Sequence, residues 1–375
     1  MLDNISIKGF RFLDGLNLRG ANKFNLIVGP NNSGKTSLLE ALFIHCAPLN
    51  CNMLLTLLSF RNGGFLPNQA YVFDRFKWFF TDPQSQSTGK FNISGTWNIV
   101  QRKTEVSFVD RSVHQEGTST KTNGVITTST VDPALIKDND QEGIEKEGIS
   151  IGTINFLFES SKQKRIKQSF EFTSKGPLRI DGPKIRTDVP AVYTDPFGHR
   201  NPEGGLGDYN KAAKEGHDKK CLELMSKLDP EIENISILLA PNNVPELFVT
   251  HKSLGKTPIS NLGDGLRRIF IVSTAMSRCK GGVFLVDELE NSVHPSALAE
   301  FINWIFDIAK ELNIQIFTTT HSLEAIDAVL GSKIISEDDL SLFRLKSDDK
   351  KIACKKISGK TLKDLRYELA QDVRL

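Results

Sequence analysis

A cluster of glycines, a lysine and a threonine near the N-terminus has the composition and spacing of a phosphate-binding loop. The octapeptide is Gly29-Pro30-Asn31-Asn32-Ser33-Gly34-Lys35-Thr36, followed by Ser37. A glycine-bounded loop that leads into a helix points several backbone N–H groups at one spot, where the helix dipole favours negative charge. Lys35 supplies a cation for the β and γ phosphates, and the Thr36 hydroxyl is placed to coordinate Mg²⁺. The stretch therefore predicts ATP or GTP binding; a Gly/Ser-rich surface turn would not need a Lys-Thr pair before an apolar helix.

Two carboxylates form a second candidate site. Asp287 and Glu288 directly follow the apolar run Val283–Val286, which is expected to be a buried strand. In open α/β sheets, ligands lie beyond the carboxyl ends of the strands. We expect Asp287 to hold Mg²⁺ opposite Thr36, and Glu288 to orient and polarise the attacking water. An acidic turn that caps a strand is the alternative for this dipeptide taken alone.

A histidine ends a third buried strand. The run Ile316-Phe-Thr-Thr-Thr-His321-Ser322 passes from apolar residues to hydroxyls and an imidazole. We expect His321 to reach the γ-phosphate and to act with Glu288 in catalysis, because an imidazole both donates and accepts hydrogen bonds near neutral pH. A purely structural histidine at a strand end is the alternative.

These three groups need strands and helices that bring them to one edge of a sheet. Strands are predicted near the N-terminus and helices follow the phosphate-binding loop, with helix-like spacing also at Leu54–Phe60 and Tyr71–Phe80. The last third alternates: helices at Leu262–Ser277, from Ser296 and at Ser322–Leu330, and strands at Val283–Val286 and Ile314–Phe317. Strands that alternate with helices imply an α/β fold with a sheet covered on both faces. A hairpin over Leu340–Ile357 and a short helix over Leu362–Leu369 are expected to close the domain.

The middle of the chain has a different character. Residues 91–185 contain short alternating segments with β-branched and aromatic residues, typical of strands, around a mobile loop at about 114–150 that is poor in large apolar residues. We therefore divide the chain into an N-terminal part of the ATPase domain (1–90), a β-rich inserted lobe (91–185) and a C-terminal part (186–375). The last part is expected to begin with a strand, a loop over Asp195–Gly207, a helix at Cys221–Leu228 and a strand at Ile232–Leu239. Residues 45–255 keep no heptad over several turns, which argues against a long coiled coil.

Composition sets broad limits. The chain has 375 residues and a formal net charge of +2, which argues neither for nor against nucleic acid. Its five cysteines are scattered and form no CxxC pair, as expected in a reducing cytoplasm. No apolar run approaches the roughly 18 residues that a spanning helix requires, so no membrane partner is expected.

A further segment carries a resemblance to a known superfamily. Gly263-Asp264-Gly265 stands at the start of a predicted helix. Together with the phosphate-binding loop, the Asp-Glu strand and the histidine strand, this segment makes the chain resemble the ATP-binding-cassette ATPases. The resemblance is strongest to the branch containing the RecF, SMC and OLD (overcoming lysogenization defect) proteins. The three residues stand where that superfamily has its Leu-Ser-Gly-Gly signature, which binds the γ-phosphate of a nucleotide held by the other subunit. Gly263 replaces the usual serine, so Arg267 or Arg268 is a candidate for the missing contact. A solvated helix face is the alternative for this arginine pair.

The resemblance extends to Ile5–Phe12 and to Asp287–Pro295 with its His294-Pro295 ending. It implies a P-loop NTPase fold of ABC-ATPase type with a mixed central sheet, ATP and Mg²⁺ as cofactors, and a homodimer or higher oligomer that encloses nucleotide. Gln69 and Gln101 are candidates for the glutamine of the Gln-loop. His294 is expected either to shape the dimer-facing loop or to start a helix.

By the same resemblance, the chain is expected to be a switch ATPase that hydrolyses ATP and controls a partner effector in bacterial anti-phage defence. About 45 residues follow Leu330, too few for the Toprim nuclease domain of many OLD proteins. A separately encoded effector such as a nuclease is therefore the expected partner. The alternative is a RecF-like DNA repair clamp that contacts duplex DNA through Lys162, Lys164, Arg165 and Lys167, although a charged hairpin face is the favoured account of these residues. A transporter subunit is disfavoured by the degenerate signature and the large β insertion.

Overall fold

A mixed six-stranded sheet lies at the centre of the computed structural model. The structure describes residues 1–62, 75–81, 88–110, 151–173, 176–181, 189–200, 205–240, 243–348 and 351–374. The strand order is β16-β15-β3-β14-β13-β9, in which β16 is antiparallel to β15 and the other pairs are parallel. These strands are β3 (Phe24–Val28), β9 (Ala191–Thr194), β13 (Val283–Val286), β14 (Gln315–Thr319), β15 (Leu340–Asp348) and β16 (Lys351–Ser358). The parallel core places the carboxyl ends of β3, β13 and β14 at one edge, as the sequence predicted.

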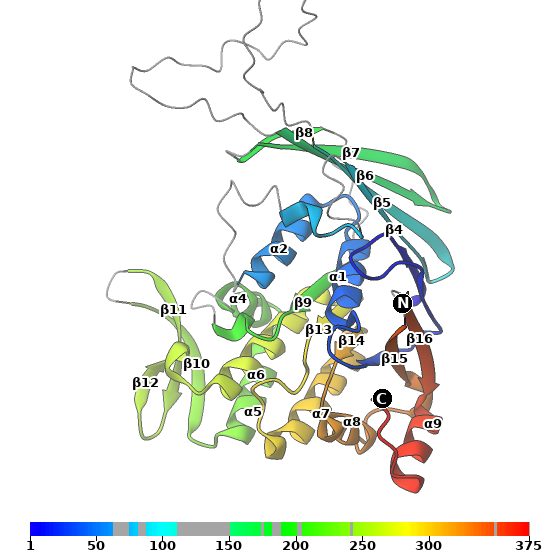
Figure 1. The fold of residues 1–375 in the computed structure, drawn as a ribbon. Helices are drawn as coiled ribbons and strands as arrows, with labels where there is room; N and C mark the ends of the chain where they lie inside the picture. Colours follow the sequence, from blue (N-terminus) through cyan, green and yellow to red (C-terminus); the bar gives the residue numbers. More distant parts are fainter. Residues whose placement is uncertain are drawn as a thin grey trace, which may run out of the picture.

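Both faces of this sheet are buried. Because side chains alternate along a strand, Leu26 of β3 packs into one hydrophobic core while its neighbour Ile27 packs into the other. On one face lies α1 (Lys35–Cys46), and the opposite face is covered by several helices (Figure 1). These helices include α5 (Asp218–Leu228), α6 (Asp264–Ala275), α7 (Pro295–Glu311) and α8 (Leu323–Leu330). This arrangement confirms the predicted α/β fold with helices flanking a mixed sheet.

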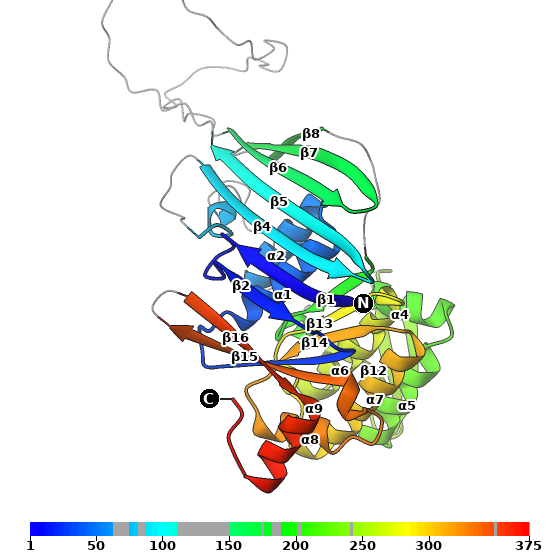
Figure 2. The ribbon, with the colours of Figure 1, turned by 90° about the vertical axis from the view of Figure 1, so that its right-hand side faces the viewer.

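A second, antiparallel sheet of seven strands lies on the other side of α1. Its order is β2-β1-β4-β5-β6-β7-β8, and Figure 2 shows β1 and β2 continuing the sheet towards β15 and β16. Nearly every side chain of α1 is buried, as expected of a helix packed between two sheets. The strands are β1 (Leu2–Lys8), β2 (Leu16–Arg19), β4 (Thr88–Trp97), β5 (Val100–Asp110), β6 (Ile151–Ser160), β7 (Gln163–Thr173) and β8 (Gly176–Asp181). The strands expected in the middle of the chain are therefore confirmed, and they share one sheet with the N-terminal strands.

A small third sheet was only partly predicted. It has the order β10-β11-β12, of which the sequence indicated β10 (Ile232–Leu239) but neither β11 (Pro245–His251) nor β12 (Gly255–Pro258). The helix α4 (Leu206–Lys214) begins within the segment expected to be a loop. These elements are short and half exposed, so their apolar residues form no clear periodic pattern.

The remaining elements agree with expectation. Helix α2 (Cys51–Arg61) follows α1, and the C-terminal hairpin β15–β16 is confirmed. The last helical segment starts earlier than predicted, as α9 (Gly359–Lys363), and continues as a π turn over Asp364–Glu368. Residues 71–74, Gln69 and the predicted loop at 114–150 lie outside the described residues. Within the described part, no helix is long and apolar enough to cross a membrane.

Candidate nucleotide-binding site

The phosphate-binding loop connects the fully buried strand β3 to the start of α1. Gly34 precedes the helix with φ 90°, a conformation that glycine adopts without strain, and an added Cβ would lie 2.6 Å from a methyl carbon of Leu13. The helix begins at Lys35 without a side-chain cap. Its first N–H groups therefore point into the loop, where an anion is the natural partner.

The amine of Lys35 lies inside this loop. Its Nζ donates hydrogen bonds to the carbonyl oxygens of Gly29 at 2.9 Å and Pro30 at 3.0 Å. Burial lowers the pKa of Lys35, while the carboxylates of Asp287 and Glu288 act in the opposite direction. The cation is thus held within the loop and faces the acidic end of β13.

Asp287 is fixed by two neighbouring strands. Its Oδ1 accepts a hydrogen bond from the Thr319 hydroxyl of β14 at 2.5 Å, and its Oδ2 accepts one from the Tyr193 hydroxyl of β9 at 3.1 Å. The side chain is 3% exposed. Burial raises the pKa of Tyr193, and the neighbouring carboxylate adds to that effect, so the phenol stays a donor. Thr36 and Asp287 line one cavity, and a Mg²⁺ that keeps water and phosphate ligands needs only one or two such protein oxygens.

Glu288 has an unusual backbone conformation. Its φ is 52°, in the left-handed region that non-glycine residues rarely adopt, and its N–H donates to the Thr319 hydroxyl at 2.7 Å. The same hydroxyl therefore orients two consecutive carboxylate residues. Burial raises the pKa of Glu288, and the carboxylates of Asp287 and Glu290 raise it further. Strained backbone of this kind is often found at functional sites.

His321 lies in the same cavity as the phosphate-binding loop and the two carboxylates. Its backbone N–H donates to Glu290 Oε1 at 2.8 Å, and its side chain lines the same cavity as the loop. Burial lowers the pKa of His321 and the Lys35 cation lowers it further, while Glu290 and Asp287 oppose this. A neutral imidazole is thus favoured in the absence of ligand.

One cavity of 860 Å³ collects most of the predicted residues. They are Asn31, Asn32, Ser33, Gly34, Lys35, Thr36, Ser37, Asp287, Glu288 and His321. Gly29 and Pro30 do not line it, but their carbonyl groups hold Lys35. Three chain segments far apart in sequence therefore meet at the edge of the sheet, as the strand-end argument required.

The sequence reasoning missed three residues that line the same cavity: Arg11, Phe12 and Arg61. The buried carboxylate of Glu40 on α1 pairs with Arg11 at 2.9 Å and with Arg61 at 2.7 Å. Burial lowers the pKa of Arg11 to about 10. Phe12 is 75% exposed and presents an aromatic ring beside the loop. Arg11 and Phe12 lie in the segment Ile5–Phe12 that carries the family resemblance, and Glu40 is a charged residue on the apolar helix α1, but neither signal reveals these contacts.

The signature-like segment lies outside this cavity. Gly263 is the N-cap of α6, and Asp264 pairs with Arg200 at 3.0 Å and with Arg267 at 3.4 Å. Nothing lies within 4 Å of a Cβ added at Gly263, whereas one added at Gly265 would lie 2.7 Å from the carbonyl oxygen of Ser292. The first glycine leaves the helix start open, and the second permits close packing.

The expectation that Arg268 contacts the partner's nucleotide is wrong, and so is the alternative of a solvated helix face for this residue. Arg268 is 0% exposed; its guanidinium donates to the carbonyl oxygen of Asp195 and, at 2.9 Å, to that of Asp287. Burial lowers its pKa, while Asp195 and Asp287 act in the opposite direction. Arg267 also folds inward, donating to the carbonyl oxygen of His199 at 2.7 Å. Two adjacent arginines in the sequence do not indicate which side of α6 is buried.

Arg268→Ala is expected to destabilise the protein by about 3 kcal/mol or more, since breaking a buried charged network commonly costs about 3–5 kcal/mol. The substitution removes one hydrogen-bond donor from the carbonyl oxygen of Asp195, which keeps a contact with the Gly198 N–H at 3.5 Å, and one from that of Asp287. Urea unfolding followed by circular dichroism measures this. The control is Arg278→Ala, which removes a surface pair with Asp208 and should cost less than about 1 kcal/mol. Equal costs for the two variants would contradict the structural role of Arg268.

Two further candidates are placed clearly. His294 is the N-cap of α7, and its ring nitrogen accepts a hydrogen bond from the Ser296 N–H, so it starts a helix, as one alternative proposed. Gln101 lies exposed on β5 and lines a different hollow from the nucleotide cavity. It is therefore not a cavity residue, and the Gln-loop assignment to Gln101 is wrong.

The fold and the cavity define a P-loop nucleotide-binding protein of the α/β class. The family model described as "AAA domain, putative AbiEii toxin, Type IV TA system" matches residues 24–327, and the chain belongs to this family. The chain is thus an ATPase of the AAA/ABC type. The match spans the phosphate-binding loop, the Asp287-Glu288 strand end and His321.

Individual proteins that this chain resembles share less than 30% sequence identity with it. A Helicobacter pylori protein named "ATP/GTP phosphatase" is 23% identical over 376 residues, covering 96% of this chain and 97% of that protein. "Uncharacterized protein MJECL11" of Methanocaldococcus jannaschii is 29% identical over 113 residues, covering 30% of this chain and 99% of that protein. Among solved structures, an SMC head bound to the C-winged helix domain of ScpA is 12% identical with a TM-score of 0.48, and covers 99% of both chains. The SMC head domain of Thermotoga maritima is 11% identical with a TM-score of 0.40, covering 95% of this chain and 99% of that one.

Proposed function

We propose that this chain is a switch ATPase of the OLD, RecF and SMC-like branch, in which two copies enclose two ATP molecules. The observation that carries the proposal is the cavity that joins Lys35, Asp287, Glu288 and His321 in one lining. In this reading Lys35 and the loop bind the phosphates, and Thr36 and Asp287 hold Mg²⁺, which neutralises phosphate charge when bound. The name of the Helicobacter pylori relative supports nucleotide hydrolysis.

The hydrolytic step follows from the positions of the acidic and basic groups. Glu288 orients a water molecule for in-line attack and accepts its proton, and His321 donates a hydrogen bond to the γ-phosphate. The Thr319 hydroxyl fixes the Asp287 side chain and the Glu288 backbone relative to each other, because it forms hydrogen bonds with both. Only a nucleotide with a γ-phosphate then engages all of these groups.

The second copy would complete the site through Gly263, Asp264 and Gly265. The open N-terminus of α6 offers backbone N–H groups to a phosphate, and Gly263 leaves space around it. Because these residues do not line the cavity of their own chain, their contact with ATP requires a partner copy. ATP binding would then favour the dimer, and hydrolysis would release it.

The dimer is tested by sedimentation velocity with Mg²⁺ and either a non-hydrolysable ATP analogue or ADP. We expect a dimer with the analogue and a monomer with ADP. Gly265→Ala should weaken the dimer at least about tenfold, because its methyl group would lie 2.7 Å from the Ser292 carbonyl oxygen and displace the helix start. Gly263→Ser is the matched control at an open position, and it should preserve or strengthen the dimer by adding a capping hydroxyl. If the protein has the same mass with the analogue as with ADP, the proposed nucleotide-enclosing dimer would be refuted.

We further propose that the switch controls a separately encoded effector, such as a nuclease, in bacterial anti-phage defence. The matching family is itself described in terms of a toxin–antitoxin system, which supports a defence role. In this scheme residues 1–90 and 186–375 form the ATPase body, and residues 91–185 form an inserted β-rich lobe whose strands extend the sheet of β1 and β2. The alternative DNA clamp rests on the basic cluster alone, in which Arg165 forms an exposed surface pair with Glu159 at 3.0 Å.

A further inference from the structure

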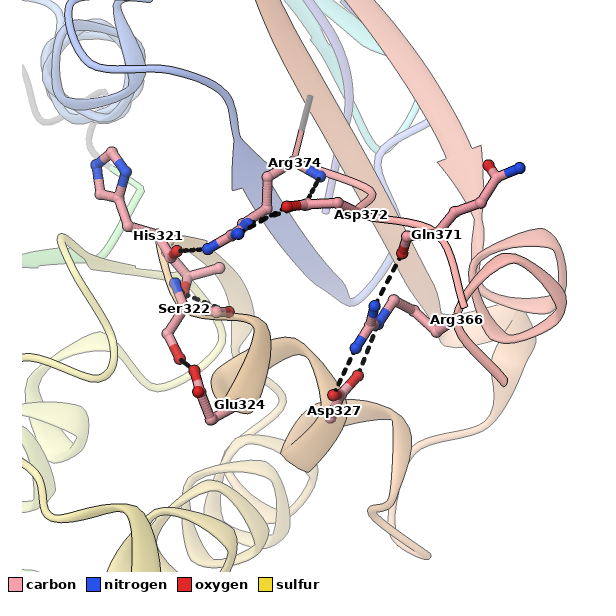
Figure 3. A network of polar contacts seen from close by, with 9 residues as sticks. His321, Ser322, Glu324, Asp327, Arg366, Gln371, Asp372 and Arg374 are labelled. Carbon is pink, nitrogen blue, oxygen red and sulfur yellow. Dashed lines mark hydrogen bonds and ion pairs between the residues drawn. The ribbon is translucent and has the colours of Figure 1, made fainter. Parts of the chain in front are cut away.

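The segment Gln371–Arg374 crosses from the C-terminal helical turn to the loop that carries His321 (Figure 3). Val373 is 2% exposed and belongs to the hydrophobic core beneath the central sheet, so it anchors the segment. After this anchor Arg374 contacts the histidine loop, and before it the carbonyl oxygen of Gln371 accepts a hydrogen bond from Arg366. The segment is therefore built into the region next to the nucleotide cavity.

Arg374 makes the contact with the histidine loop. Its Nη1 donates to the carbonyl oxygen of His321 at 2.6 Å. Asp372 holds the same guanidinium, with Nε at 2.9 Å from Oδ1 and Nη2 at 2.6 Å from Oδ2, and Asp372 Oδ1 also accepts the Arg374 N–H at 3.0 Å. A two-point carboxylate contact restricts the guanidinium to one orientation. The Asp372 contact thus holds the Arg374 side chain in the conformation in which Nη1 bonds to His321.

A second arginine ties the same segment to α8. Arg366 makes a two-point contact with Asp327 of α8, at 2.8 Å and 2.7 Å, and its Nη1 donates to the carbonyl oxygen of Gln371 at 2.8 Å. Helix α8 begins immediately after the N-cap Ser322, the residue that follows His321. The Gln371 end of the segment is therefore linked to α8 through Arg366, and the Arg374 end contacts the histidine loop directly.

The backbone of His321 is held from two sides. Its N–H donates to Glu290 Oε1 and its carbonyl oxygen accepts from Arg374, whereas its imidazole has no hydrogen-bond partner among the described residues. Figure 3 shows the imidazole directed away from Arg374 while the carbonyl oxygen faces it. Fixing the peptide group leaves the ring to face the cavity in a defined direction.

We propose that Arg374, oriented by Asp372, is a positioning residue that fixes the backbone of His321 so that its imidazole meets the γ-phosphate. The inference rests on the proposed role of His321 in hydrolysis. It requires no contact between Arg374 and the nucleotide. A small displacement of a group that must meet a transition state lowers the rate even when substrate binding is unchanged. Arg374 therefore contributes to kcat rather than to the affinity for ATP.

The test is steady-state ATP hydrolysis by Arg374→Gln in the full chain. We expect kcat to fall about tenfold, the loss typical of one charge-assisted hydrogen bond, with KM for ATP within about twofold of wild type. Arg374→Lys keeps a cationic donor but loses the two-point contact with Asp372, so its kcat should lie between those of Arg374→Gln and wild type. Asp372→Asn leaves Arg374 present but less restrained, and should give an intermediate kcat. An unchanged kcat in Arg374→Gln, or an equal loss in Arg374→Lys, would overturn the proposal.

The matched control is Lys363→Gln, which removes a surface pair with Glu337 at 2.8 Å in the same C-terminal region and should leave kcat unchanged. His321→Gln separates the two hypotheses. If it hydrolyses ATP at the wild-type rate, the proposed role of His321 fails. If it is slow while Arg374→Gln is normal, only the positioning role fails. In the double variant, the loss should not exceed that of His321→Gln alone, because both changes remove one interaction.

Discussion

Lys35→Ala is expected to abolish measurable binding of ATP. The Lys35 amine is 2.9 Å from the Gly29 carbonyl oxygen and 3.0 Å from that of Pro30, so it lies where bound phosphates would meet the loop. Charge-assisted hydrogen bonds contribute about 1.5–3 kcal/mol each, so losing those to phosphate should weaken binding at least about a hundredfold. The variant also loses the internal contacts that shape the empty loop. Its effect should therefore exceed that of removing any single hydroxyl in the cavity.

Isothermal titration calorimetry with Mg²⁺ and a non-hydrolysable ATP analogue measures this effect. Lys8→Ala is the control, since Lys8 is an exposed lysine at the end of β1 and outside the cavity lining. It should bind the analogue as wild type does. Binding by Lys35→Ala within about threefold of wild type would show that the loop is not the phosphate site, because one lost charged contact alone exceeds that margin.

The nucleotide cavity was largely predictable because each of its parts has a local signal. Gly34, Lys35 and Thr36 follow a buried strand and open a helix, and Asp287 follows another buried strand. Parallel strands place such ends side by side, so the meeting of these residues follows from the alternation of strands and helices. His321 follows the same rule, because β14 lies between β3 and β13.

The sequence did not reveal the side-chain contacts between elements that are far apart in the chain, because no motif links such residues. Glu40 binds Arg11 and Arg61 from two different elements, and Asp287 binds Tyr193 from a strand 94 residues away in sequence. Such partners depend on how helices and strands pack, which a single sequence with no pairing information does not specify. Strands β11 and β12 were missed for the related reason that the apolar residues of these short strands do not alternate regularly with polar ones.

The same limit explains the error at Arg268. Two adjacent residues of a helix point in directions about 100° apart, so an arginine pair alone does not indicate which side chain faces the protein. Arg268 turns inward and links the loop after β9 to the end of β13. A residue expected to act on a partner's nucleotide instead supports the position of Asp287 in its own chain.

Glu288→Gln should slow ATP hydrolysis by about 10²–10⁴-fold while leaving ATP binding intact, because general-base catalysis contributes about that factor. Glutamine has the same shape, and the backbone contact of residue 288 with the Thr319 hydroxyl does not involve the side chain. The amide cannot accept a proton from water, but Lys35 and Asp287 remain in place. The variant therefore separates chemistry from binding, unlike Lys35→Ala.

A block in hydrolysis should also trap the assembled state. With Mg²⁺ and ATP itself, Glu288→Gln is expected to sediment as the stable dimer that wild type forms only with the non-hydrolysable analogue. Single-turnover phosphate release measures the chemical step. Glu300→Gln makes the same change on α7 at a half-exposed surface pair with Lys227, and it should behave as wild type in both assays. Normal phosphate release by Glu288→Gln would remove its role as the base, whatever its oligomeric state. Slow release without a trapped dimer would instead keep the catalytic assignment and show that hydrolysis does not control association.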